Sequence, residues 1–169
     1  MPEKKTVFVD TCAIIDAVRL GCWADLCRDY AIQTVEEVRD ETQRGDKSDP
    51  EYVVVDPGCF GTTVAVHAVS NTMRTRAATR LRSIPVDRGE FDLLAFVLTQ
   101  DPNALILSST DAAAVTAGCQ LGLSSRFRSL EQLVARGRAT PIKFPEKCTE
   151  KWLGDIKTKF ESQRGARGI

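Results

Sequence analysis

Acidic residues follow short apolar runs at several points of the chain. Asp10 comes directly after residues 7–9, and Asp111 comes shortly after residues 105–107. Short apolar runs of this kind predict strands that are buried on both faces of a parallel sheet. In such sheets, ligands bind beyond the carboxyl ends of the strands. We therefore expect Asp10 and Asp111 to lie at one edge of a sheet, with Asp92, which opens a helix after the extended residues 84–86, beside them.

Two further acids, Glu37 and Glu41, lie on a helix expected after the strand that ends at Thr34. Residues four apart share one face of a helix, so the residue pattern alone leaves both as candidates. Carboxylates gathered at one place repel one another unless a cation neutralises them. A set of oxygen ligands suits Mg²⁺ or Mn²⁺, ions that activate water and stabilise charge in phosphodiester hydrolysis.

Hydroxyl groups stand next to these acids at Thr11, Ser109 and Thr110, where they could orient the ligands of a metal ion. The competing interpretation is structural, because an Asp at the end of a strand is more often the N-cap of the following helix. Asp111 precedes an Ala-rich helix and fits that role by itself. Acids at four successive junctions nevertheless favour a shared site.

Strand-like and helical segments alternate along the chain. Strands are predicted over 6–9, 30–34 and 104–108, with a strand-like run at 52–55. Helices are predicted over 13–20, 22–29, 35–43, 62–82, 87–99, 111–119 and 145–160, and 127–135 is expected to be a strand or turn leading into a helix. This alternation predicts a three-layer α/β/α fold around a parallel sheet of about four to five strands. Residues 1–140 are expected to form the domain, and 141–169 a helical extension packed on it or trailing from it.

The overall composition is that of an ordinary globular domain. The chain has 169 residues, 43% hydrophobic and 27% charged, with 23 basic and 23 acidic residues. Global charge therefore gives no reason to expect nucleic acid, but Arg74, Arg76, Arg80 and Arg82 are concentrated in one segment. They are either a solvated helix face or a surface that binds phosphates. Without an apolar run of roughly 20 residues or a signal-peptide core, no membrane segment is expected and a cytoplasmic location is predicted.

The other residues that could carry chemistry are less informative. Six cysteines contain no C-x-x-C pair, and His67 is the only histidine, so a zinc site of the usual spacing is not expected. The cysteines are predicted to be reduced, mostly buried thiols. Cys22 and Arg28 have the C-x5-R spacing of cysteine phosphatases, but no strand precedes this segment and no glycine lies within it. His67 is predicted to be a packed or surface residue.

The order of the acidic motifs resembles the PIN-domain family. Residues 7–15 match "hhhDTxxhh", a helix glutamate follows the second strand, residues 89–92 match "GExE/D", and residues 105–118 match a strand, S/T-x-D and a small-residue helix. The similarity covers roughly residues 6–135. It implies a metal-dependent nuclease, most often a ribonuclease, with Mg²⁺ or Mn²⁺ held by Asp10, Asp92, Asp111 and either Glu41 or Glu37.

The sequence departs from the family pattern in two places. Many members have Asn at the position of Cys12, which weakens an outer contact but removes no ligand. The region from about 45 to 82 is longer and richer in arginine. Glu90, two residues before Asp92, is expected to point elsewhere on its helix than Asp92 and to be an outer contact of the site at best. The resemblance leaves open a structure-specific DNA nuclease and a non-catalytic scaffold that binds RNA or protein. An antitoxin or other protein partner, or a homodimer, also stays open.

Overall fold

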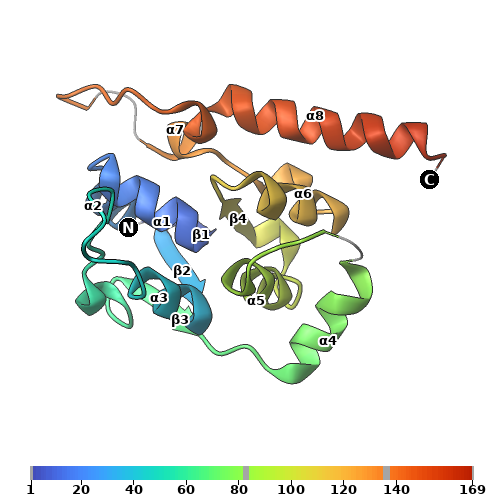
Figure 1. The fold of residues 1–169 in the computed structure, drawn as a ribbon, viewed down its shortest axis with the longest axis horizontal. Coiled ribbons are helices and arrows are strands. Elements are labelled where there is room, and N and C mark those ends of the chain that lie inside the picture. Colours follow the sequence, from blue (N-terminus) through green and yellow to red (C-terminus); the bar gives the residue numbers. More distant parts are fainter. Residues whose placement is uncertain (1, 82–83, 135–137, 169) are drawn as a thin grey trace.

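The computed structural model describes residues 2–81, 84–134 and 138–168. Four short strands form one parallel sheet in the order β3-β2-β1-β4 (Figure 1). Their bounds are β1 Thr6–Val9, β2 Ala31–Val35, β3 Val64–His67 and β4 Leu105–Ser108. Helices flank the sheet, and the predicted α/β fold with a parallel sheet of four to five strands is confirmed. Because all strands are parallel, their carboxyl ends lie at one edge.

The helices follow the strands in the expected alternation. Their bounds are α1 Thr11–Arg19, α2 Trp23–Asp29, α3 Glu36–Thr42, α4 Asn71–Arg80, α5 Arg88–Val97, α6 Ala112–Gln120, α7 Leu130–Leu133 and α8 Glu150–Ala166. Short 3-10 turns lie at Pro57–Cys59, Pro102–Ala104, Ser124–Arg126 and Glu146–Cys148. None of the helices in the described part of the chain is long and apolar enough to cross a membrane.

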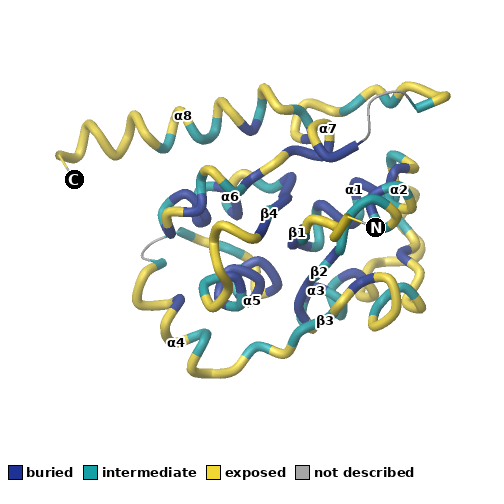
Figure 2. The backbone as a smooth tube through the Cα atoms, turned by 180° about the vertical axis from the view of Figure 1, so that it is seen from behind, coloured by how far each residue is buried: buried dark blue, intermediate teal, exposed yellow. Residues whose placement is uncertain are grey.

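The core lies between the sheet and its flanking helices. The side chains of Val7, Phe8 and Val9 are all buried, as expected for a strand covered on both faces. Leu93 and Leu94 of α5 pack against this core, and α5 contacts β1 and β2. Figure 2 shows burial concentrated on the strands and α5, whereas α4 and most of α8 lie exposed at the outside.

The predicted helix over 62–82 is wrong in its first part. The chain forms the edge strand β3 there, which pairs with β2, and α4 begins only after Ser70. Val66 alternates with Val64 as in a strand but also has helical spacing to Val69 and Met73, and pairing with β2 decides for the strand. The Ser70 hydroxyl then accepts a hydrogen bond from Met73 N and caps α4. Residue 82 lies outside the described residues.

The strand-like run at 52–55 is also not a strand. These residues are irregular, with Val55 buried and Val54 exposed by 71%. Three valines have high intrinsic strand propensity, but in the described residues no neighbouring strand supplies hydrogen bonds to them. The extended segment 84–86 is likewise a loop that leads into α5.

The C-terminal segment packs on the body of the protein through the first part of α8. This helix runs along α6 and α7 (Figure 1), with Leu153 buried and its last turns exposed. Just before it, Lys147 Nζ lies 2.7 Å from Asp16 Oδ2 on α1. The predicted division into 1–140 and 141–169 stays a prediction.

A close contact between α6 and the segment after it depends on a glycine. A Cβ atom at Gly118 would lie 2.3 Å from Phe127 Cε2, far inside van der Waals contact. Phe127 itself is buried, and its backbone forms a parallel bridge with Leu107 of β4. Gly118 therefore lets α6 approach the ring that closes this edge of the sheet.

We expect Gly118→Ala to lower the free energy of unfolding by about 1–3 kcal/mol, because the added methyl overpacks the contact with Phe127. The matched control is Gly154→Ala on the exposed face of α8, where a Cβ would meet nothing within 4 Å. There alanine should stabilise by about 0.5–1 kcal/mol through its helix propensity. Chemical denaturation measures the change in unfolding free energy for each variant. If Gly118→Ala also stabilised the protein, the proposed packing against Phe127 would be contradicted.

Candidate functional site

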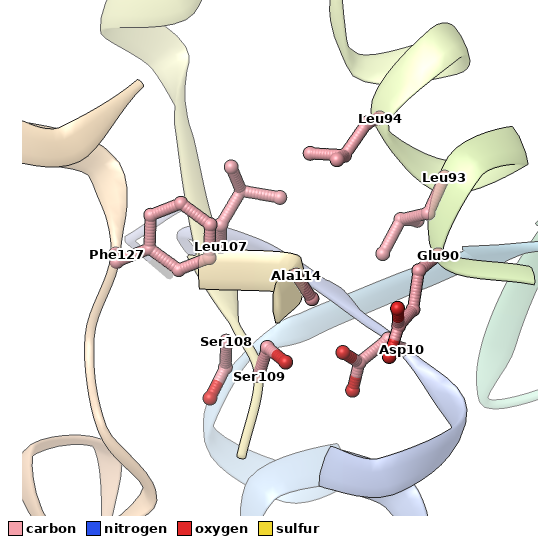
Figure 3. A pocket seen from close by; sticks show the side chains of 9 residues that line it. All are labelled: Asp10, Glu90, Leu93, Leu94, Leu107, Ser108, Ser109, Ala114 and Phe127. Atoms are coloured by element: carbon pink, nitrogen blue, oxygen red, sulfur yellow. The ribbon is translucent and has the colours of Figure 1, made fainter. Parts of the chain in front are cut away.

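Three acids from different parts of the chain gather at the carboxyl edge of the sheet. Asp10 and Glu90 line one small cavity, and the Glu90 carboxylate extends toward Asp10, whose own carboxylate lies on the side of Ser109 (Figure 3). One donor atom each from Glu90, Asp111 and Cys12 lie within 4.8 Å of one another. Asp10, Glu90 and Asp111 therefore lie near one another, and the charges of Asp10 and Asp111 both act on Glu90.

Asp10 and Asp111 each use one carboxylate oxygen to cap a helix. Asp10 Oδ1 accepts a hydrogen bond from Ala13 N at 2.8 Å, at the start of α1. Asp111 Oδ1 accepts from Ala113 N at 2.7 Å, at the start of α6. The second oxygen of each residue is not needed for the cap. Helix capping and membership of the site are thus combined in the same side chains rather than being alternatives.

Glu90 is held in the same way at the start of α5. Its Oε2 accepts a hydrogen bond from Asp87 N at 3.1 Å, across the first turn of the helix. Three helix N-termini, those of α1, α5 and α6, therefore converge on the acids. The partial positive charge of a helix N-terminus stabilises a nearby carboxylate, so the backbone offsets part of the repulsion in the cluster.

The second carboxylate oxygen of Asp10 takes part in no hydrogen bond within the described residues. Oδ2 is buried, and no hydrogen-bond partner for it is found among the residues described. It faces a cavity of about 10 Å³ whose floor is apolar and includes Leu107 and Phe127. Figure 3 shows the Ser109 hydroxyl directed toward Asp10 and that of Ser108 directed away. A buried carboxylate oxygen without a partner costs free energy, so its retention points to a missing ligand.

Burial and like charges shift the acid–base behaviour of the cluster. Burial raises the pKa of Asp10 to about 6, and the charges of Asp111 and Asp16 add to this, while the nearby Ser109 hydroxyl opposes it. Burial, followed by the charges of Asp10 and Asp111, raises the pKa of Glu90 to about 8. Such shifts are expected of acids arranged for a cation that would stabilise their charged forms.

These residues fit a divalent cation. Carboxylate oxygens from Asp10, Glu90 and Asp111 form a hard donor set of the kind that Mg²⁺ and Mn²⁺ prefer. The unpartnered Asp10 oxygen and the mutual repulsion of the acids both favour a positive charge among them. Cys12 departs from this hard set because it adds a sulfur atom.

Glu41, predicted as a ligand, lies beside the cluster with both oxygens engaged. Oε2 accepts a hydrogen bond from Thr11 Oγ1 at 2.6 Å, and Oε1 accepts from Gly89 N at 2.8 Å. A Cβ at Gly89 would lie 2.3 Å from Glu41 Oε2, so the glycine permits this approach. Glu41 therefore links the residue after Asp10 to the residue before Glu90.

Glu37, the alternative ligand, is occupied by arginines. Its Oε1 lies 3.1 Å from Arg44 Nη1 and its Oε2 lies 3.4 Å from Arg88 Nε. Both carboxylate oxygens thus face basic side chains at the molecular surface. The two glutamates, four apart on α3, have different surroundings, and Glu41 is the one that reaches the residues next to the acids.

Asp92 is placed away from the cluster's donor atoms and forms an ion pair. It is 2% exposed, and its two oxygens accept hydrogen bonds from Arg74 Nε at 2.7 Å and Nη2 at 2.8 Å. Residues two apart on a helix lie about 200° apart around its axis, so Glu90 and Asp92 cannot both face the cavity. Glu90 thus points away from Asp92, as expected, but it is Glu90 and not Asp92 that lines the cavity with Asp10.

A sequence signal for Glu90 exists in the helical spacing. Leu93 and Leu94 belong to the core-facing side of α5 and line the cavity with Glu90, at spacings of three and four. Asp92 does not share that spacing. The Asp87-x-x-Glu90 capping pattern also fixes Glu90 in the first turn, where its side chain is held close to the helix N-terminus.

The hydroxyls predicted to orient ligands all lie in this region. Thr11 contacts Glu41, and Ser109 Oγ accepts a hydrogen bond from Asp111 N at 3.0 Å. Thr110 Oγ1 donates to Asp16, a buried acid on α1 that sequence reasoning did not single out. Asp16 also pairs with Arg19 and with Lys147.

The arginines proposed to bind phosphates have mixed surroundings. Arg74 is paired with Asp92, and Arg80 Nη2 donates a hydrogen bond to Leu121 O at 3.1 Å. Arg76 lies exposed on α4, and Arg82 lies outside the described residues. Two of these side chains therefore attach α4 to the body.

The remaining motifs are explained by packing. The His67 ring stacks on Phe96 with centroids 4.3 Å apart and hydrogen-bonds to Gln33 at 2.8 Å. Cys22 is buried, with its thiol near Ala17 O, and the Arg28 guanidinium pairs with neighbouring aspartates. The six cysteines are free, as expected.

Comparisons with family models, with curated proteins and with solved structures found no match for this chain. The resemblance to the PIN-domain family therefore stays a prediction, and the chemistry of the site rests on its own residues.

In EDTA-treated protein, we expect stability to fall as the pH rises from about 4 toward 8. Asp10 and Glu90 hold their protons more tightly in the folded state, so the unfolded chain ionises first across this window. Glu90→Gln should reduce the total loss of unfolding free energy across this window by on the order of 4 kcal/mol. Urea denaturation at several pH values measures the pH dependence of the unfolding free energy. The exposed Glu161→Gln serves as the control, and an unchanged pH dependence in Glu90→Gln would contradict the raised pKa of Glu90.

Arg74→Ala should lower the free energy of unfolding by about 2–4 kcal/mol, because it leaves the buried Asp92 carboxylate without a partner. The double variant Arg74→Met/Asp92→Leu should recover most of the loss. Arg76→Ala, on the same helix but exposed, should stay within about 0.5 kcal/mol of the wild type. Equal effects of the two arginine variants in denaturant titrations would argue against the ion pair.

Proposed function

We propose that this protein is a metal-dependent ribonuclease whose divalent cation is held by Asp10, Glu90 and Asp111. The observation that carries the proposal is the buried oxygen of Asp10 without a hydrogen-bond partner among the described residues, in a residue that lines one small cavity with Glu90. Mg²⁺ or Mn²⁺, when bound, would supply a Lewis acid and an activated water for phosphodiester hydrolysis. Glu90 takes the place that the sequence pattern gave to Asp92.

The chain's own groups prepare the site for that charge. Backbone N–H groups at the N-termini of α1, α5 and α6 each bind one oxygen of an acid. Because these side chains are already held in place, little side-chain entropy would be lost when a cation binds to their other oxygens. Glu41 holds the starts of α1 and α5 together through Thr11 and Gly89. The apolar floor of the cavity excludes water behind the carboxylates and strengthens their interaction with a cation.

RNA is proposed as the substrate because of the resemblance to PIN domains, and the exposed Arg76 is a candidate contact to its phosphates. A structure-specific DNA nuclease on the same fold is the alternative substrate class. The cytoplasmic location, which is predicted from the lack of a signal-peptide core, stays a proposal. A protein partner such as an antitoxin is proposed from the same resemblance, and a homodimer also stays open.

The test is cleavage of labelled single-stranded RNA with Mg²⁺ or Mn²⁺ by wild type, Asp10→Asn, Glu90→Gln and Asp92→Asn. Asp10→Asn and Glu90→Gln should lose activity by about a hundredfold or more, since ligand loss exceeds the usual effect of outer contacts. Asp92→Asn should remain within about tenfold at a temperature where it is folded, because its role is the ion pair with Arg74.

Several outcomes would contradict the proposal. Equal cleavage by wild type and Asp10→Asn would remove the site from the reaction. Preferred cleavage of flapped or linear DNA would favour the DNA nuclease. Absence of metal binding in titration calorimetry would favour a non-catalytic scaffold. Loss of activity in Asp92→Asn but not in Glu90→Gln would restore Asp92 as the ligand.

A further inference from the structure

Cys12 places a thiol beside the acids of the proposed metal site. It lies in the first turn of α1, two residues after Asp10, and its side chain is half-buried. Its Sγ and one oxygen each from Glu90 and Asp111 lie within 4.8 Å of one another. Within the described residues, this is the one group of three or more potential metal donors found at such distances.

A second feature of the same place points independently to a ligand. Asp10 is 1% exposed, and its Oδ2 is buried without a hydrogen-bond partner in the described part of the chain. Asp10 lines the same cavity as Glu90, and the Glu90 carboxylate extends toward it (Figure 3). A buried, unpartnered carboxylate oxygen beside these donors is what a bound cation would satisfy.

We propose that Cys12 Sγ is a direct donor to this cation and makes the site selective for thiophilic divalent ions. The inference rests on the metal site of the proposed function. Carboxylates alone suit Mg²⁺, whereas thiolate favours softer ions, so Mn²⁺ should bind in preference to Mg²⁺, and Co²⁺, Zn²⁺ and Cd²⁺ more tightly still. On binding, the S–H bond breaks, a sulfur–metal bond forms and the proton passes to water.

The chain offers a matched control for this proposal. Cys27 is also a free, half-buried cysteine on a short helix, but it is not part of the donor group. Replacement of Cys12 by serine keeps the size and polarity of the side chain while removing the soft donor. Glu90→Gln and Asp111→Asn remove hard donors and leave the thiol in place.

The experiment titrates the EDTA-treated full chain with Co²⁺ and follows the near-ultraviolet charge-transfer absorption of a thiolate bound to cobalt. Wild type and Cys27→Ser should show a saturable band, and Cys12→Ser should not. Competition titrations should then show Cd²⁺ binding weakened by about tenfold or more in Cys12→Ser, with Mg²⁺ binding changed by less than about twofold. Retained Mg²⁺ binding also shows that the variant is folded; Cys12→Ala provides a second variant with the same expected result.

The outcomes separate this inference from the proposed function. The role of Cys12 is overturned, while the metal site stands, in either of two cases. In the first, wild type binds Co²⁺ in a way that requires Glu90 but shows no charge-transfer band. In the second, Cys12→Ser keeps the charge-transfer band. A band that survives in both Glu90→Gln and Asp111→Asn would mean that the thiol binds cobalt independently of the cluster, which also overturns it. Absence of any metal binding in wild type would overturn the proposed function together with this inference.

Discussion

Repulsion among buried carboxylates is the constraint on which the site depends. Asp10 and Glu90 are buried, and their like charges, together with that of the half-buried Asp111, interact more strongly than they would in water. The fold answers this by bringing the N-termini of α1, α5 and α6 to the same edge of the sheet, so that backbone N–H groups bind one oxygen of each acid. Burial, and after it the neighbouring charges, raises the pKa of Asp10 and Glu90, and the proposed cation would relieve this repulsion.

Acids outside the cluster hold its elements in register. Glu41 connects α1 to α5 through Thr11 and Gly89, and its approach requires that residue 89 be glycine. Asp16 connects α1 to Thr110, just before Asp111, and to Lys147 of the C-terminal segment. The first helix is therefore tied to segments 30 to about 130 residues away along the chain, and the last segment becomes part of the support of the site.

The ion pair between Arg74 and Asp92 performs a different task on the far side of α5. It neutralises a buried acid and attaches the exposed helix α4, which otherwise has little apolar surface to bury. This explains why an arginine-rich helix lies against the body and why Asp92 needs no metal ion. Helix α5 thus carries two acids with different roles. Asp92 is paired with the Arg74 guanidinium, and Glu90 lies in the cavity.

The sequence by itself determined the parallel α/β fold, the strands at β1, β2 and β4, and the positions of Asp10 and Asp111 at their ends, because apolar runs and strand-to-helix junctions are local patterns. It did not separate β3 from α4, since Val66 alternates with Val64 as in a strand but also has helical spacing to Val69 and Met73, and only pairing with β2 favours the strand. Only the tertiary structure decided that Glu90 rather than Asp92 lies beside Asp10, and only it brought Cys12 close to Glu90 and Asp111. The rotation of a helix about its own axis is set by the surfaces it packs against, and those surfaces lie far away in the sequence.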